Sequence, residues 1–488
     1  MFTSSICDNK LDESNVKSMY EIYPFPPLSI GETQLISTSS SGLPRYPRNF
    51  IGPSQWIDIV HHVFQGSVPK QPVKLLFAGA GTGTSTMLLC NQLRSANINF
   101  TAVHFDLSSA SIKIATKRAK LLGHSITFVQ GSLLNENDML KVKRLGHYDY
   151  IDCVGVLMAT VDPVAALRNL GQMLNPSSPS GIGIMIYGKY GRAPIYQIRR
   201  TMELLTKGNS TKKGDNLKIL RKVLKDDGNH WARLSKLGQH AETYDDISLV
   251  DTYLHPVDTS FNCQELFKLV KDAKLHFGSF TVPMLYDATT IPHQKNENDL
   301  SSNDIRTLSS SLDFFQLAEL GEVMDGTIER HEFYALNAKR NYPSIIDSPH
   351  MILALRIPLL YFKRKLLLSL VNKGQIEVGA SEAGHRARIL KIPKNINRHH
   401  LFKVAKQINQ IETASGDILK NLYSSSNYKN NIQKVCNEMK LQKTALRWLV
   451  DVLLMQSGFG VIIKKKGLDV KYSTWDQLIP KCNMDRLE

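Results

Sequence analysis

Three glycines directly after an apolar run are the residues whose spacing first suggests chemistry. The stretch "KLLFAGAGTGTSTMLLC", residues 74–90, places Gly79, Gly81 and Gly83 within five positions. Glycine adopts backbone conformations that other residues avoid, and it lets a ligand approach the main chain closely. The apolar run before the glycines predicts a strand, and the apolar spacing after them predicts a helix. The N–H groups at the start of that helix favour a nucleotide-like ligand.

Asp106 is the second residue with a chemical role. It ends the expected strand "NFTAVHFD", 23 residues after Gly83. If this strand lies beside the first one, the carboxylate can accept hydrogen bonds from both hydroxyls of a ribose. That geometry suits either NAD or S-adenosylmethionine. The dinucleotide fingerprint GxGxxG requires a third glycine where this chain has Thr84, so the spacing favours S-adenosylmethionine.

The elements that must position these residues alternate between strands and helices. The expected strands cover residues 73–77, 99–106, 125–131, 147–157, 181–188, 277–283 and 330–337. Between them, helices are expected at 108–123 and 162–174. Such alternation predicts an α/β fold, a Rossmann-like and mainly parallel sheet with right-handed crossovers. Ligands bind at the carboxyl ends of strands in such sheets.

The motifs in this order resemble a known family. "LLFAGAGTG", "VHFDLS" and "YDYIDCVGVL" look like successive motifs of the class I S-adenosylmethionine-dependent methyltransferases. Further stretches such as "YEIYPFPPL" and "DGTIERHEFYA" resemble methyltransferase-domain proteins whose substrates are mostly undefined. The resemblance covers roughly residues 19 to 336. It implies a class I methyltransferase sheet, S-adenosyl-L-methionine as cofactor, and an added helix-rich module at the C-terminal end.

The resemblance also implies which residues hold the cofactor. The loop would pass under the methionine part, the second and third strands would hold the ribose and adenine, and the fourth would flank the sulfonium. These residues are Gly79, Ala80, Gly81, Gly83, Asp106, Leu107, Gly131, Ser132, Val154, Gly155 and Val156. Two positions depart from the family. Many members carry an acid at Phe77 and an aspartate at Ser132, and a hydroxyl binds an amine more weakly than a carboxylate does.

The sequence indicates the residues around the reacting methyl group less specifically than it indicates the cofactor residues. Methyl transfer in line depends on positioning, and a base is required only when the acceptor arrives protonated. The catalytic candidates are Tyr187, Tyr190, His255 and Asp258, near Arg192 and Tyr196. Tyr20, Tyr23 and Phe25 belong to a segment that could cover the cofactor. The alternative is that these are half-buried structural tyrosines and a loop histidine.

Some acceptors are disfavoured by the sequence. The place after the fourth strand reads "VGVLMAT", without the [D/N]PP[Y/F] motif of enzymes that methylate base amines. It also lacks the Pro-Cys pair of cytosine C5 chemistry. The six cysteines show no CxxC and no zinc spacing, so no metal is expected. Cys90 and Cys153 lie in apolar stretches, which indicates buried, reduced thiols, and the expected location is cytoplasmic.

The chain divides into three expected parts. Residues 1–70 form an N-terminal arm or lid, with a linker-like stretch at 24–48. Residues 71–340 form the methyltransferase domain, with inserts near 207–245 and 286–305, the second a mobile loop. Residues 341–488 form a basic C-terminal module, loosely of winged-helix type. No apolar run reaches the roughly 18 residues of a membrane span.

Charge is concentrated in that last module. Residues 351–488 hold 24 Lys and Arg against 10 Asp and Glu, an excess of 14 in a chain of formal net charge +16. An acidic partner such as RNA is one expectation, and a solvated basic face on an accessory or homodimer-forming domain is the other.

Three functions follow from these patterns. The first is methyl transfer to an N or O nucleophile of a protein side chain or small molecule. The second is an RNA methyltransferase that docks through the basic module. The third is a non-catalytic cofactor-binding scaffold or regulatory subunit that keeps the methyltransferase fold.

Overall fold

The structure is a computed structural model of the 488-residue chain. It describes residues 13–27, 29, 53–64, 69–70, 72–95, 97–206, 213–226, 228–235, 244–291 and 301–339, and four short strands beyond them. The helices expected in the C-terminal module, including the winged-helix-like part, lie outside the described residues.

A seven-stranded sheet forms the centre of the fold, with the order β3-β2-β1-β4-β5-β7-β6. Its strands are β1 (Val73–Ala78), β2 (Phe100–Asp106), β3 (Thr127–Gln130), β4 (Tyr150–Val154), β5 (Gly181–Tyr187), β6 (His276–Phe280) and β7 (Arg330–Leu336). The first five strands pair in parallel, and β7 runs antiparallel to both β5 and β6. The predicted mainly parallel α/β sheet is confirmed.

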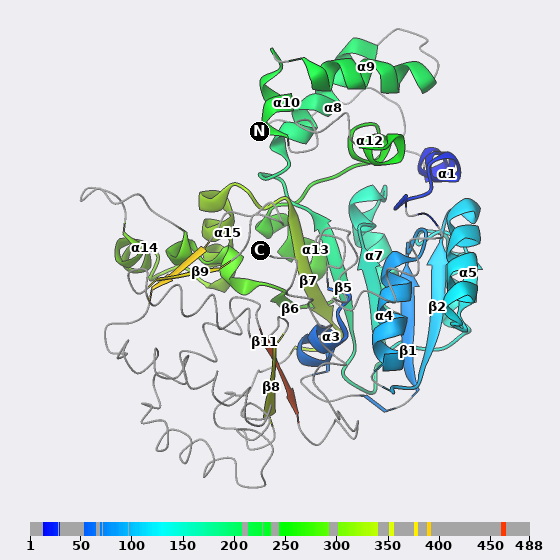
Figure 1. Ribbon diagram of the computed structural model, residues 1–488. Helices are drawn as coiled ribbons and strands as arrows, with labels where there is room; N and C mark the ends of the chain where they lie inside the picture. Colours follow the sequence, from blue (N-terminus) through cyan, green and yellow to red (C-terminus); the bar gives the residue numbers. More distant parts are fainter. Residues whose placement is uncertain are drawn as a thin grey trace, which may run out of the picture.

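Helices cover both faces of this sheet (Figure 1). One face carries α3 (Trp56–His62), α4 (Thr84–Ser95) and α5 (Ser109–Leu122). The other carries α6 (Glu136–Lys143), α7 (Pro163–Gly171) and α13 (Cys263–Asp272), with α15 (Phe314–Asp325) against α13. The central strands β1, β4 and β5 are buried on both sides, which explains their continuous apolar runs, whereas the edge strands β3 and β6 are partly exposed.

Local signals in the sequence fix where these helices begin and end. The Ser108 side chain accepts from the backbone N–H of Ser111 and caps α5, which ends at Gly123 with a φ of 65°. Asp162 caps α7 in the same way. Asp149 accepts from the backbone N–H of Lys74 at 2.9 Å, at the opposite edge of the sheet from the glycine loop. Asp149 and Asp162 therefore have structural roles.

A group of helices lies above the carboxyl ends of the strands, at the top of the view in Figure 1. It consists of α8 (Ala193–Thr206), α9 (Lys213–Lys225), α10 (His230–Leu234) and α12 (Asp246–Tyr253), which share a small apolar core. The insert near 207–245 therefore contributes helices to a cap over the ligand-binding edge. α1 (Glu13–Ile22) lies beside this cap and contacts α5.

The second insert, predicted to be a mobile loop, is described only in part, because residues 292–300 lie outside the described residues. Two short 3-10 helices, η3 (Pro283–Tyr286) and η4 (Ala288–Thr290), pack against α15, and α14 (Ser302–Leu308) follows. Tyr286 is buried against Phe280, with ring centroids 3.5 Å apart. Apolar contacts at both ends of the insert thus hold the described part in place.

The expected arm consists of two described parts with different surroundings. Glu13–Pro27 crosses the carboxyl edge of the sheet, whereas Trp56 and Phe64 are buried in the core beside β1 and β4. Beyond residue 350, β8 (Met351–Leu355) pairs with β11 (Gly460–Lys464), and β9 (Gln375–Val378) pairs with β10 (Arg388–Lys391), both antiparallel. No helix among the described residues is both long and apolar enough to span a membrane.

Candidate active site

The glycine loop has the backbone shape that its sequence predicts. Gly79, Gly81 and Gly83 all adopt positive φ angles, of 63°, 53° and 88°. A Cβ atom at Gly79 would lie 2.6 Å from the side chain of Val156. One at Gly81 would lie 2.4 Å from the carbonyl oxygen of Phe25. The loop therefore requires glycine both for its conformation and for its close neighbours.

Asp106 lies against this loop, as its position at the end of β2 predicts. Its Oδ2 accepts from the backbone N–H of Gly81 at 2.7 Å, and its Oδ1 accepts from Ser108 N at 2.8 Å. Each carboxylate oxygen has a second lone pair that a hydroxyl donor can use. Burial raises the pKa of Asp106 to about 6, although these N–H groups oppose the shift. The carboxylate is thus held rigidly and is ionised at neutral pH.

Polar groups near the loop are consistent with a bound ligand. Thr84 begins α4, and its Oγ1 is buried without a hydrogen-bond partner among the described residues. The first N–H groups of a helix also lack intrahelical acceptors. A ligand with a charged or polar end over the loop would satisfy these donors, while a ribose would bind Asp106. The amino-acid and nucleoside parts of S-adenosylmethionine fit this set of donors and acceptors.

The N-terminal segment closes over the same loop. Thr82 donates its backbone N–H to the carbonyl oxygen of Phe25 at 3.0 Å, and its hydroxyl to that of Pro26 at 2.8 Å. The buried guanidinium of Arg118 donates in turn to Thr82 O at 2.7 Å. Glu21 accepts from the backbone N–H groups of Ser109 and Ala110 at the start of α5. These contacts hold the segment beside the loop, and its role as a lid stays a prediction.

All eleven predicted cofactor residues lie at one edge of the sheet. They follow or end strands β1 to β4: Gly79, Ala80, Gly81, Gly83, Asp106, Leu107, Gly131, Ser132, Val154, Gly155 and Val156. Gly131 N donates to the carbonyl oxygen of Asp106 at 3.0 Å, which joins the ends of β2 and β3. Gly155, directly after β4, has a φ of 77°, and its N–H donates to the carbonyl oxygen of Met185 on β5.

A buried polar cluster lies between this edge and the helical cap. We call it the tyrosine cluster, and it consists of Tyr20, Tyr187, Asp251 and His255. Tyr20 Oη donates to Asp251 Oδ1 at 2.9 Å and lies 3.2 Å from His255 Nε2. Tyr20 also lies close enough to Asp106 and Tyr187 for their charges to raise its pKa, after burial and Asp251.

The protonation of His255 follows from its partners. His255 Nδ1 accepts from the backbone N–H of Val257 at 3.1 Å, so the neutral ring carries its proton on Nε2 and donates to Tyr20. Burial lowers the pKa of His255 to about 4. Burial also raises the pKa of Asp251 to about 6. The proton acceptor in this arrangement is therefore Asp251, and the arrangement does not favour His255 as the base.

The other predicted catalytic candidates have different surroundings. Asp258 accepts from Tyr196 Oη at 3.0 Å and lies between two arginines, 3.5 Å from Arg199 and 3.9 Å from Arg192. The guanidinium carbon of Arg192 lies 3.4 Å from the ring centroid of Tyr187. Asp258 thus holds the arginine that covers Tyr187, a positioning role.

Tyr190 is half-buried beyond the end of β5, and its carbonyl oxygen accepts from Ala193 N. No hydrogen bond joins its hydroxyl to the tyrosine cluster in the described structure.

Sequence reasoning missed three acids in or near the site. Asp251 interrupts the apolar pattern of α12, and Asp152 interrupts that of β4, where it accepts from Ser54 and Ser85. Asp152 on β4 is the neighbour of Phe77 on β1. Phe77 stands at the position where many members of the family carry an acid. Glu13, which accepts from the Ser132 hydroxyl near the end of β3, gave no signal, because a glutamate on a short helix is ordinary. Asp251 and Asp152 could have been found, because each is an isolated acid inside an apolar segment.

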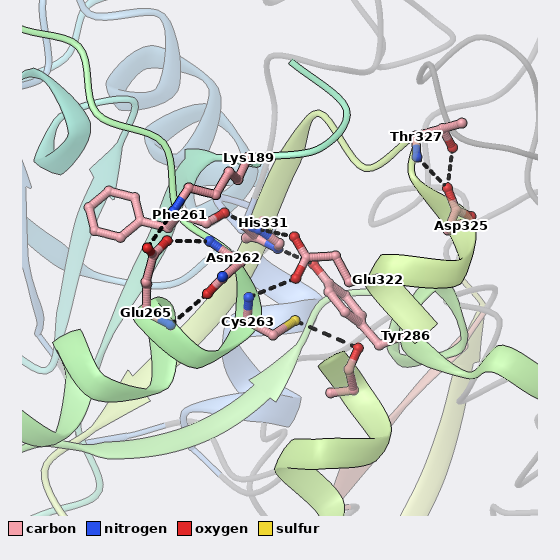
Figure 2. Close-up of polar contacts among 11 residues, drawn as sticks. Lys189, Phe261, Asn262, Cys263, Glu265, Tyr286, Glu322, Asp325, Thr327 and His331 are labelled. Atoms are coloured by element: carbon pink, nitrogen blue, oxygen red, sulfur yellow. Dashed lines mark hydrogen bonds and ion pairs between the residues drawn. The ribbon is translucent and has the colours of Figure 1, made fainter. Parts of the chain in front are cut away.

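One buried group of side chains outside this edge has potential metal-ligating atoms. Figure 2 shows Cys263, Glu322 and His331 pointing toward one another, with their ligand atoms within 4.8 Å. His331 Nε2 lies 2.9 Å from the carbonyl oxygen of Phe261. A carbonyl only accepts, so this nitrogen carries a proton and is not available to a metal. Burial raises the pKa of the Cys263 thiol, which keeps it protonated as well.

The same group has a clear structural role. Glu322 lies 3.2 Å from His331 Nε2 and accepts from the backbone N–H of Cys263, the first residue of α13, at 2.7 Å. Tyr286 Oη lies 2.9 Å from His331 Nδ1. These contacts join α13, α15, η3 and β7 (Figure 2).

Residues 76–178 match a family model described as a methyltransferase domain. This span begins in β1 and includes the glycine loop, Asp106 and the β4 edge. This part of the chain is therefore a methyltransferase domain.

The similarity to known proteins extends beyond the methyltransferase domain. An uncharacterized protein of Synechococcus sp. is 28% identical over 324 residues, covering 65% of this chain and 70% of the relative. The solved structure of PKMT2 from Rickettsia typhi has a TM-score of 0.50 at 15% identity, covering 86% of this chain and 77% of PKMT2. Its complex with AdoHcy has a TM-score of 0.48, also at 15% identity, with 90% and 77% covered. The likeness to PKMT2 concerns the fold.

The methyltransferase domain accounts for the cofactor-binding edge. S-adenosylmethionine is the methyl donor of this class, and it is the cofactor indicated for this chain. The resemblance to methyltransferases, which was inferred from motifs that include the glycine loop and Asp106, is confirmed.

Proposed function

We propose that this chain transfers a methyl group from S-adenosylmethionine to an N or O nucleophile of a protein side chain or small molecule. The observation that carries the proposal is the position of Tyr20. Its ring belongs to the helix that covers the cofactor edge, and its hydroxyl donates to the buried Asp251 of the cap. A hydrogen-bonded acid therefore lies next to the place where the methyl donor binds.

The residues of the chain divide the work of the reaction. S-adenosylmethionine, when bound, supplies a methyl group activated by its sulfonium. The glycine loop and Thr84 orient the methionine part, and Asp106 orients the ribose. Arg192 and the cap helices keep water from the tyrosine cluster, where Tyr187 and Arg192 are both largely buried.

A protonated acceptor must lose its proton before it attacks the methyl group. Asp251 Oδ1 is the acceptor at the end of the His255–Tyr20–Asp251 chain of hydrogen bonds. Its pKa of about 6 places it within one unit of neutral pH, a suitable value for a general base. The ring face of Tyr20 offers a surface on which a cationic amine can be aligned before it loses the proton.

An RNA acceptor is the second candidate, because an excess of 14 positive charges lies in residues 351–488. Most of these residues lie outside the described part of the chain. A non-catalytic scaffold is the third, since Phe77 and Ser132 depart from the usual pattern. The expected cytoplasmic location and homodimer remain predictions.

Two measurements separate these functions. Calorimetry with S-adenosylhomocysteine tests the cofactor, and release of S-adenosylhomocysteine from the methyl donor tests turnover on peptide, small-amine and RNA substrates. Binding with turnover only on peptides or amines is the expected result. Binding without any turnover would favour the scaffold, and failure of the chain to bind the cofactor product would contradict the proposed function.

A further inference from the structure

α1 is fastened to the cofactor edge by an acid near each end. At its C-terminal end, Glu21 accepts from the first N–H groups of α5. At its N-terminal end, Glu13 Oε1 accepts from the hydroxyl of Ser132 at 2.6 Å. Glu13 is the first residue of the helix, and Ser132 lies two residues beyond the end of β3. The contact therefore brings a carboxylate to the end of β3 from 119 residues away in the sequence.

The hydroxyl of Ser132 is already used by the protein. It donates its one proton to Glu13 and accepts from the backbone N–H of Leu134 at 3.0 Å. Ser132 is only 6% exposed. Glu13 is half-buried, and its Oε2 has no hydrogen-bond partner among the described residues. The acceptor available to a ligand at this position is thus the Glu13 carboxylate, and Ser132 holds it in place.

The strand order shows which part of the cofactor reaches this position. Asp106 ends β2, and the glycine loop follows β1, with Val154–Val156 beyond it on β4. A ligand with its ribose at Asp106 and its amino-acid part over the loop must direct its base the other way. In the order β3-β2-β1-β4, that direction is toward β3, where Ser132 and Glu13 lie.

We propose that Glu13 accepts a hydrogen bond from the exocyclic amine of the adenine and thereby determines the base specificity of the cofactor site. The inference deepens the proposed function and depends on it. A carboxylate binds an amine donor by a charge-assisted hydrogen bond. It repels a purine that carries a carbonyl oxygen at the same position, because two acceptors then face each other. α1 is therefore a part of the binding site as well as its cover.

The test compares two ligands on three proteins by calorimetry. The ligands are S-adenosylhomocysteine and S-inosylhomocysteine, in which a carbonyl oxygen replaces the amine. Wild type should prefer the adenosyl ligand by roughly 10- to 100-fold, the range of a charge-assisted hydrogen bond. Glu13→Gln should reduce this preference to about threefold or less, because the amide NH₂ can donate to the carbonyl oxygen. The Glu13 side chain is half-buried on a surface helix, so the variant should fold. The ratio of the two ligand affinities is measured within each protein, so a general loss of binding does not alter it.

Glu21→Gln is the matched control on the same helix. It weakens the attachment of α1 to α5 without touching the base, so both ligands should lose affinity equally and the ratio should remain as in wild type. An unchanged ratio in Glu13→Gln, or a wild type without preference, would overturn the assignment of Glu13. If wild type binds neither ligand, the proposed function fails along with the inference.

Discussion

The carbonyl oxygen of Phe25 lies 2.4 Å from the position that a Cβ atom would occupy at Gly81. The glycine loop is therefore covered from outside by the backbone of the N-terminal segment. This contact explains why the middle glycine admits no side chain, and it makes the loop and the segment above it a single site.

Gly81→Val should abolish binding of S-adenosylhomocysteine while the chain stays folded. The new side chain would meet Phe25 O, and a φ of 53° strains a branched residue. Gly123→Ala is the matched control, since Gly123 also has a positive φ, of 65°, but nothing within 4 Å of an added Cβ. The control should bind normally. Calorimetry that finds normal binding in Gly81→Val would mean that the loop glycines serve only the turn.

Asp106→Ala should weaken S-adenosylhomocysteine binding by roughly 2–3 kcal/mol, through loss of charge-assisted hydrogen bonds to the ribose. Wild-type affinity should also fall as the pH drops through about 6, because protonation removes an acceptor at Asp106. Asp149→Asn, at the opposite edge of the sheet, is the control and should leave affinity unchanged. Titration calorimetry from about pH 5 to about pH 8, which brackets the raised pKa of Asp106, measures both the affinity of the variant and the pH dependence of wild type. An unaltered affinity in Asp106→Ala would remove this residue from the site.

Tyr20→Phe should lower turnover by roughly 100-fold, the lower limit for general acid–base catalysis, with little change in S-adenosylhomocysteine affinity. The ring remains, but the hydrogen bond to Asp251 is lost. Wild-type turnover should fall as the pH drops through about 6, because Asp251 becomes protonated and can no longer accept a proton. Asp251→Asn should abolish that dependence. Tyr190→Phe, outside the tyrosine cluster, should behave like wild type, and equal losses in both tyrosine variants would argue against the cluster.

Glu322→Gln should lower the free energy of unfolding by about 3 kcal/mol, because it leaves a buried histidine facing an amide donor. Asp272→Asn breaks the exposed ion pair with Lys268 and should cost less than about 1 kcal/mol. Urea denaturation compares the two variants. A chelator should not change the wild-type midpoint, since His331 Nε2 donates to Phe261 O. A chelator-dependent midpoint would instead indicate a metal at Cys263, Glu322 and His331.

The full-length chain should bind single-stranded RNA at low salt if its basic module meets nucleic acid. The excess of 14 positive charges in residues 351–488 motivates this prediction. Counterion release gives a log–log salt slope of about −0.7 per phosphate contact, so affinity should fall steeply between low and moderate salt. Filter binding across a salt series measures it. Weak, salt-independent retention would instead support a solvated basic face.

Local sequence signals accounted for the sheet and for the cofactor edge. The glycine spacing, Asp106 and the strand pattern each depend on neighbouring residues, so they can be recognised without the fold. The caps at Ser108 and Asp162 have the same local origin. The extent of the predicted elements was correspondingly accurate at β1 and β2.

Contacts between distant segments could not be predicted in this way. The Tyr20–Asp251 hydrogen bond joins residues 231 positions apart, and Glu13 reaches Ser132 across 119 positions. His255 was a plausible base until the N–H of Val257 fixed which ring nitrogen is protonated. These outcomes depend on how the cap and the N-terminal segment fold over the sheet, which no local pattern specifies.

Tyr20 and Glu21 are successive residues of α1, yet they face different partners: Asp251 of the cap and the start of α5 beside the cofactor edge. The helix cannot release one partner as a rigid unit without pulling on the other. Under the proposed function, we expect this segment to lift before the spent cofactor leaves, and the same lifting would separate Tyr20 from Asp251. Each cycle should then follow one order, with donor binding first, segment closure second and methyl transfer third.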